Sequence, residues 1–271
     1  MAEMNPDRQR IALVLEFDGS PFSGWQQQDN AASVQDVLQQ ALARIEGHEV
    51  QAVAAGRTDA GVHAEAMLVH ADVSSARWQR SPMAYVHGLN SQLPGSVRAV
   101  AVRAVAPYFH ARFDCRERAY TYRIWNRTTA SALHAWRHWW MPRLLDEARM
   151  REAAAFARGK QDFSALRAAG CQASGAVRTI RELSIWRDGF VVGIDVRADA
   201  FLYHMVRNLV GNLVDVGIGR TSADDFARLL EGGDRSKGGA TAPAHGLYFT
   251  DAVYDDFSAR SLLAIPGDSR G

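Results

Sequence analysis

The stretch VQAVAAGRTDAGVHAEAMLVHA, residues 50–71, predicts two strands joined by a short loop. Its ends, 50–55 and 64–71, are apolar runs of strand length. Between them lies GRTDAGVH, in which Asp59 stands between two glycines. Because glycine permits tight turns and close backbone approach, we expect a strand–loop–strand unit with a carboxylate in its loop.

The segments on either side extend this unit. Residues 10–17 alternate as a half-buried strand does, and Ser33 is placed to cap a helix that Gly47 ends. Downstream, Ser81-Pro82 is typical of a helix start, and 97–105 reads as a strand. The order strand, helix, strand, strand, helix, strand is that of the ferredoxin-like motif.

The second half is predicted to repeat this order, with its hairpin turning at Asp188-Gly189. The expected strands are 118–125, 177–186, 190–198 and 247–254, and the expected helices are 144–158, 203–216 and 223–230. We therefore predict an α+β protein of two ferredoxin-like halves, residues 8–106 and 107–256, with largely antiparallel sheets and a cleft between them. The Gly-rich segment 231–246 is too long for an ordinary connection, which suggests a functional role.

Composition excludes several classes of protein. No apolar run reaches the 18 residues that a membrane helix needs, and the polar start MAEMNPDRQR lacks a signal core, so we expect a cytoplasmic location. Cys115 and Cys171 have no CxxC spacing and are expected to be reduced, partly buried thiols. The sequence has no Walker pattern, no GxGxxG and no evident metal-ligand cluster, so we predict no cofactor and no metal.

A basic and aromatic segment, residues 112–143, is the strongest indication of RNA. It contains seven arginines, and Tyr and Trp residues are interleaved with them: Arg112, Arg116, Arg118, Arg123, Arg127, Arg137 and Arg143, with Tyr120, Tyr122, Trp125, Trp136, Trp139 and Trp140. Cations bind phosphates, and aromatic rings stack on unpaired bases. The same pattern also suits an amphipathic strand and loop with core aromatics. His134 and His138 lack a third ligand nearby and are expected to be structural.

The residues alone leave the role of Asp59 open. Arg57 precedes it by two positions and would favour the ionised carboxylate. A catalytic acid and a hairpin turn with a surface ion pair both fit this pattern.

Six blocks of the sequence, in order, resemble the TruA family of tRNA pseudouridine synthases between about residues 8 and 254. GRTDAGVHA (56–64) resembles the signature loop of that family. The other blocks are FDG with GWQ and SVQ (17–35), RAYTYR (118–123), DFS with CQ (162–172), FLYHMVRN (201–208) and APAHGLY (242–248). Such a set is far more specific than one short motif.

The resemblance implies the pseudouridine synthase fold and a homodimer that converts uridine to pseudouridine at tRNA positions 38, 39 and 40, in the anticodon stem-loop. It assigns catalysis to Asp59, and substrate contacts to Tyr120, Arg57, Arg207 and Leu247. Without the resemblance, Tyr120 reads as a core strand residue and Arg207 as a helix-face charge.

Three other functions remain to be separated from this one. They are an RNA-binding protein that has lost catalysis, a small-molecule enzyme that uses Asp59 with His63 as a base, and a pseudouridine synthase of a different RNA site.

Overall fold

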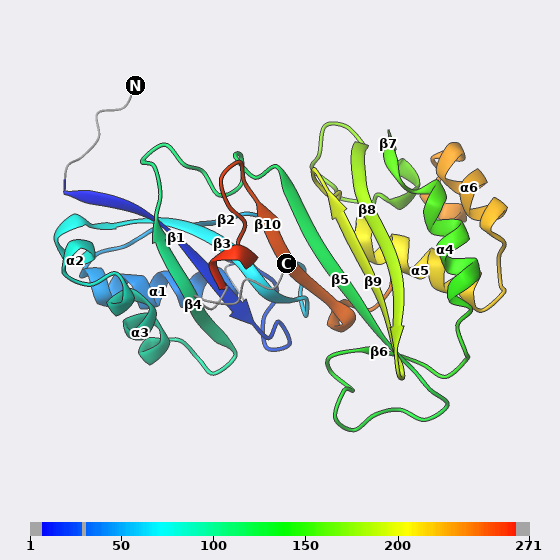
Figure 1. Cartoon of the computed structure of the whole chain (residues 1–271), viewed down its shortest axis with the longest axis horizontal. Coiled ribbons are helices and arrows are strands. Elements are labelled where there is room, and N and C mark those ends of the chain that lie inside the picture. Colours follow the sequence, from blue (N-terminus) through cyan, green and yellow to red (C-terminus); the bar gives the residue numbers. More distant parts are fainter. Residues whose placement is uncertain (1–6, 29–30, 264–271) are drawn as a thin grey trace. The chain divides into compact units, whose positions relative to one another are not determined.

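The computed structural model describes residues 7–28 and 31–263 and divides the chain into two compact units (Figure 1). Unit 1 contains the residues up to Arg118 and those from Phe249 onward, and unit 2 is Ala119–Tyr248. The predicted boundary at 106/107 falls earlier in the chain. Residues 107–116 belong to unit 1 because their backbone bonds to it: Phe109 O accepts from Arg10 (3.0 Å), and Ala111 N–H donates to His70 (3.1 Å).

Unit 1 contains the strands β1 (Arg8–Phe17), β2 (Ala52–Ala54), β3 (His63–Ser74) and β4 (Val97–Ala104), joined by β10 (Leu247–Val253) from Phe249 onward. Their order is β4-β1-β3-β10, and β2 also pairs with β3. The β1–β3, β1–β4 and β2–β3 pairings are antiparallel. Residues 11–15 of β1 are all buried, so this strand is covered on both faces and not half-buried as its alternation predicted.

The helices α1 (Val34–Glu46), α2 (Ser75–Arg80) and α3 (Met83–Gln92) accompany these strands (Figure 1). The predicted ends of α1 are confirmed. The Ser33 side chain accepts the Asp36 N–H, and Gly47 follows the helix in the left-handed conformation, φ 80°. The short helix α2 was not predicted from the sequence.

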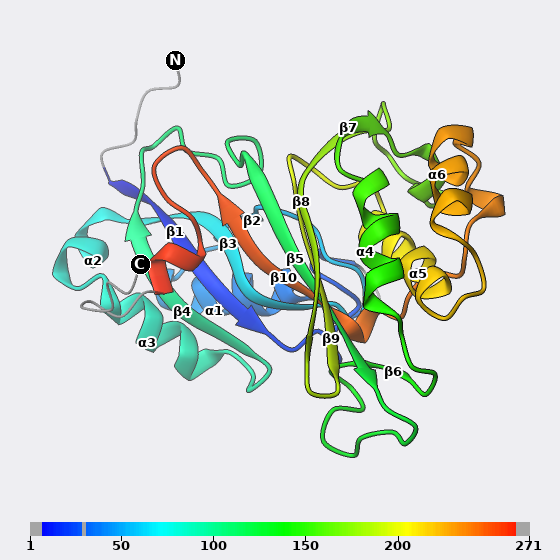
Figure 2. The same ribbon diagram turned by 45° about the vertical axis from the view of Figure 1, so that its right-hand side comes forward.

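Unit 2 contains β5 (Glu117–Asn126) from Ala119 onward, β6 (Trp139–Met141), β7 (Gly159–Asp162), β8 (Val177–Asp188) and β9 (Val191–Ala198). Their order is β5-β9-β8-β7, with β6 parallel to β5. The helices α4 (Glu147–Phe156), α5 (Met205–Gly217) and α6 (Ala223–Gly232) group together (Figure 2). Helix α4 begins three residues later than predicted because Asp146 caps it, accepting the N–H groups of Ala148 and Arg149.

The part of the chain that the structure describes also contains the 3₁₀ turns η1 (Ser164–Leu166), η2 (Arg235–Lys237), η3 (Ala244–Gly246) and η4 (Arg260–Leu263). The mixed α/β class with mostly antiparallel pairing is confirmed, whereas the two ferredoxin-like halves stay a prediction. Within residues 7–28 and 31–263, no helix is long and apolar enough to span a membrane.

Candidate functional site

The loop that carries Asp59 joins β2 to β3 and is held against the segment after β1. Trp25 N–H donates to Thr58 O (3.0 Å), and Gly61 N–H donates to Phe22 O (3.4 Å). Within the loop, Val62 N–H donates to Asp59 O (3.1 Å). Asp59 is half-buried and Arg57 is exposed. The backbone of Asp59 is therefore fixed on both sides.

Two glycines make this close approach possible. A Cβ on Gly19 would lie 2.0 Å from Val62 O, and one on Gly24 would lie 2.5 Å from Thr58 O. Gly24 also has φ +102°, which other residues rarely adopt. The packing of Gly19 directly on the Asp59 loop was not predicted from the sequence.

His63 follows the Asp59 loop and begins β3. It is 1% exposed, and Gly19 N–H donates to its Nδ1 (3.1 Å). Asp18 Oδ1 lies 3.1 Å from the same nitrogen. The bond from Gly19 ties the end of the Asp59 loop to the segment after β1.

Tyr120 belongs to unit 2, where it lies on β5 and is 9% exposed. Its ring meets Phe201 edge to face, with centroids 5.1 Å apart and an interplanar angle of 89°. This geometry is favourable for aromatic pairs and restricts the orientation of the Tyr120 ring.

Arg207, in the first turn of α5, joins that helix to the segment that leads into β10. Its Nε donates to Ala242 O (2.8 Å), and its own carbonyl accepts from Ala242 N–H (3.1 Å). Leu247, at the start of β10, is 5% exposed. The sequence alone favoured a charge on the helix face, whereas in the structure Arg207 makes two contacts with Ala242.

Tyr122 supports the same segment from β5. Its hydroxyl donates to Pro243 O (2.7 Å), and a Cβ on Gly246 would lie 2.7 Å from its ring. Burial raises the pKa of Tyr122 well above its usual value, and the nearby Arg207 charge opposes that rise. Sequence reasoning did not identify this residue as part of the site.

The Gly-rich segment 231–246 packs on α5. Asn208 Oδ1 accepts from Arg235 (3.0 Å) and from Thr241 Oγ1 (2.6 Å), and Asn212 Oδ1 accepts from Gly239 N–H (2.9 Å). A Cβ on Gly211 would lie 1.9 Å from Ala240 O. The length of the segment thus serves to position residues 242–247. Two asparagines in an apolar helix were the sequence signal for this arrangement.

The basic and aromatic segment 112–143 divides between the two units. In unit 2 its rings pack on one another: the His134 ring centroid lies 4.8 Å from that of Trp125 and 4.7 Å from that of His138. The prediction that these histidines are structural fits this packing. In the described part of the chain, no group of three or more His, Cys, Asp or Glu side chains is arranged to hold a metal ion. Leu133 and Trp136 remain exposed.

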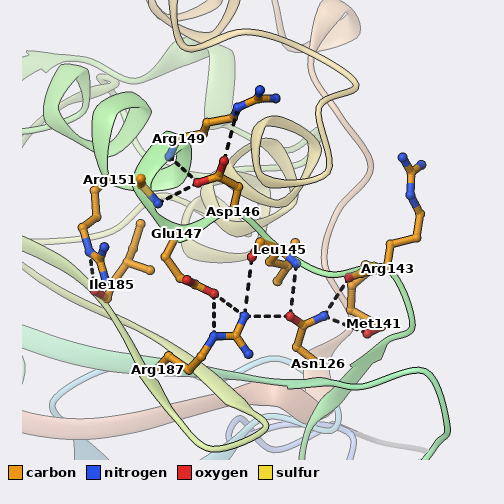
Figure 3. Close-up of polar contacts among 11 residues, drawn as sticks. Asn126, Met141, Arg143, Leu145, Asp146, Glu147, Arg149, Arg151, Ile185 and Arg187 are labelled. Atoms are coloured by element: carbon orange, nitrogen blue, oxygen red, sulfur yellow. Dashed lines mark hydrogen bonds and ion pairs between the residues drawn. The ribbon is translucent and has the colours of Figure 1, made fainter.

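Asn126 fixes the base of the loop 127–143 (Figure 3). Its Nδ2 donates to Met141 O (3.0 Å) and Arg143 O (2.7 Å), and its Oδ1 accepts from Leu145 N–H (3.1 Å). Arg187 also donates to Oδ1 (2.8 Å) and pairs with Glu147 (Figure 3). The side chain that precedes this loop therefore bonds to the backbone at the end of the loop.

The expected site residues are thus distributed over both units. Arg57 and Asp59 lie in unit 1, and Tyr120, Arg207 and Leu247 lie in unit 2. Within unit 2, Arg207 and Leu247 flank one packed segment.

Comparison with known proteins gives consistent matches. Residues 13–114 and 153–255 match the family model described as tRNA pseudouridine synthase. The protein named tRNA pseudouridine synthase A from Rhodospirillum centenum is 49% identical over 91% of this chain and 100% of its own length. The proteins of the same name from Methylobacillus flagellatus and Neisseria meningitidis serogroup B are each 44% identical, covering 96% and 92% of this chain and 97% and 93% of their own.

Proposed function

Because this chain belongs to the tRNA pseudouridine synthase family, and is thus an isomerase of tRNA uridine, we propose that Asp59 is its catalytic carboxylate. We further propose that the target uridines are positions 38, 39 and 40 of the anticodon stem-loop. Tyr120, Arg57, Arg207 and Leu247 are proposed to contact the substrate. The reaction detaches uracil from ribose, rotates it and rejoins it through carbon.

One observation carries the proposal for Asp59. The backbone on both sides of this carboxylate is clamped, by Trp25 on Thr58 and by Phe22 on Gly61, yet the side chain stays half-exposed. An ionised carboxylate at a fixed position can attack as a nucleophile or assist departure of the base, as in glycoside cleavage. Extrusion of the uridine from its stack costs a few kcal/mol, which contacts between arginines and phosphates offset.

The test is tritium release from tRNA transcribed with 5-tritiated uridine, because forming a bond at that carbon expels its hydrogen. We expect the wild type to release tritium and Asp59→Asn to be slower by at least about 1,000-fold, with tRNA affinity near wild type. The matched control is Glu49→Gln, which removes an exposed acid of the same unit and should retain the wild-type rate.

Three outcomes would contradict parts of the proposal. Substantial turnover by Asp59→Asn would remove the catalytic role of Asp59. Release from uridines outside positions 38–40, located by sequencing, would indicate a pseudouridine synthase of a different RNA site. Binding of tRNA with no release by the wild type would indicate an RNA-binding protein.

We also propose that the enzyme is cytoplasmic and that it is a homodimer. Each chain is proposed to consist of two ferredoxin-like halves. In support, β1, α1, β2, β3, α3 and β4 occur in the predicted order in the first half. Light scattering is expected to give the mass of two 29.8 kDa chains. The mass of a single chain would contradict the dimer.

A further inference from the structure

The loop 107–116 of unit 1 presents an aromatic ring and a cation to solvent. Phe113 is 74% exposed, and its ring stacks on His110, with centroids 4.2 Å apart and planes inclined by 29°. The Arg112 guanidinium carbon lies 5.9 Å from the centroid of the same ring. Such a large exposed ring, with one face supported and a cation beside it, is the arrangement on which unpaired bases stack.

The backbone of this loop is rigidly held, so the ring is presented in a defined place. His110 Nδ1 accepts from the N–H groups of both Arg112 and Phe113 (3.2 Å each), and His110 N–H donates to Asp114 Oδ2 (2.7 Å). Ala111 is fully buried and bonds to His70 through its N–H and to Tyr254 through its carbonyl (2.7 Å). A platform fixed in this way loses little conformational entropy when a ligand binds.

Arg118 connects this loop to the loop that carries Asp59. Its guanidinium donates to Cys115 O (3.0 Å) and Arg112 O on one side, and to Ala55 O (3.1 Å) on the other. Ala55 directly precedes Gly56 and Arg57. The two loops are thus neighbours within unit 1.

The charges near Arg112 are also unusual. Partial burial, followed by the positive charges of Arg57 and Arg118, lowers the pKa of Arg112. Among residues 7–28 and 31–263, no acidic side chain forms an ion pair with Arg112. Neighbouring cations that repel one another in this way are stabilised by a bound polyanion.

We propose that Arg112 and Phe113 form a nucleotide-binding platform. A phosphate of the RNA substrate binds beside Arg112, within reach of the Arg57 charge, and an adjacent unpaired base stacks on Phe113. This inference rests on the proposed function for its ligand, and it adds a binding element for the strand next to the target uridine.

The same loop provides two matched controls. Arg116 carries the same charge, but its guanidinium is paired with Asp255 through two bonds (2.9 and 3.0 Å). Tyr108 is 87% exposed and precedes the stacked pair.

The experiment measures the Kd of each variant for an anticodon stem-loop RNA at several salt concentrations, and KM and kcat for tritium release. Arg112→Ala should raise Kd about 10-fold and reduce the slope of log Kd against log salt by about 1. Phe113→Ala should raise Kd about 10-fold without changing that slope. Phe113→Trp, which keeps an aromatic ring at this position, should have the wild-type Kd. In both alanine variants KM should rise while kcat changes by less than about 3-fold.

Arg116→Ala and Tyr108→Ala should each stay within about 2-fold of the wild-type Kd. Equal effects of Arg112→Ala and Arg116→Ala, or an unchanged Kd for Phe113→Ala, would overturn the platform. Failure of the proposed function is distinguishable, because Kd is measured without turnover and tritium release reports the reaction separately.

Discussion

Two successive loops rich in arginine and aromatic residues, 107–116 in unit 1 and 127–143 in unit 2, look alike in sequence but differ in how they are held. The first is fixed by buried His70, whose Nδ1 accepts Ala111 N–H. The second is fixed by Asn126, which bonds to three backbone groups (Figure 3). An imidazole can take up a proton as the pH falls, whereas the amide of asparagine does not titrate.

The loops also differ in how their cations are used. Arg112 lies beside other cations, whereas Arg127 lies over the rings of Trp125 (5.0 Å) and Phe190 (5.4 Å) and donates to the carbonyls of Thr129 and Ala130. The composition of a segment therefore indicates that it could bind RNA. Whether an individual arginine is available for RNA depends on what its guanidinium already contacts.

The largest expected effect on stability is that of Asn126→Ala. It leaves the buried Leu145 N–H without its acceptor and removes both donors to the end of the loop. We expect a loss of about 3 kcal/mol in the free energy of local opening. Hydrogen exchange of the peptides covering residues 139–147 measures it.

Asn90→Ala provides the comparison for Asn126→Ala, because Asn90 makes only two such bonds, both with Ala99. We expect it to cost about half as much, in the peptides that cover β4. Equal costs for the two variants would mean that the bonds of Asn126 do not determine how the second loop is held.

The next effect is a pH dependence confined to the first loop. Burial, followed by the charges of Arg10 and His110, lowers the pKa of His70 from 6.5 to about 4, against smaller opposing effects of Asp72 and Asp114. Because the folded state disfavours the charged ring, its contribution to stability is complete above pH 6.5. That contribution is lost as the pH falls from 6.5 towards 4.

At pH 5 this loss should reach about 2 kcal/mol. Hydrogen exchange of residues 107–116 at pH 7.5 and pH 5, corrected for intrinsic rates, measures it. His70→Asn replaces the acceptor by one that does not titrate and should remove the difference between the two conditions. If the loop 127–143 opened equally on acidification, the contrast between the two anchors would be wrong.

Local sequence signals predicted the elements of this fold better than they predicted their contacts. Helix α1 could be predicted because Ser33 and Gly47 mark its ends by local chemistry. The strands β6 and β7 were missed because three or four residues carry no periodic pattern, and only pairing with β5 and β8 defines them.

In the candidate site, too, the sequence predicted local elements but not the contacts between distant residues. The GRTDAGVH motif identified the loop, and resemblance identified Asp59. The clamp formed by Gly19 and Gly24 depends on backbone atoms about 34 to 43 residues away in the sequence, and no local rule supplies such contacts. The anchoring roles of His70 and Asn126 were missed for the same reason.

The smallest expected effect comes from Arg127→Ala in the second loop. Loss of its contact with the Trp125 ring and of its bonds to Thr129 and Ala130 should cost about 1 kcal/mol of local stability. Its Kd for the stem-loop RNA should stay within about 2-fold of the wild type, because the guanidinium is already engaged with this loop. The contrast with the 10-fold change for Arg112→Ala is the sharpest comparison of the two loops. If Arg127→Ala weakened RNA binding as much as Arg112→Ala and lowered the salt slope equally, the contact of Arg127 with Trp125 would not prevent this guanidinium from binding phosphate. Both loops would then bind RNA.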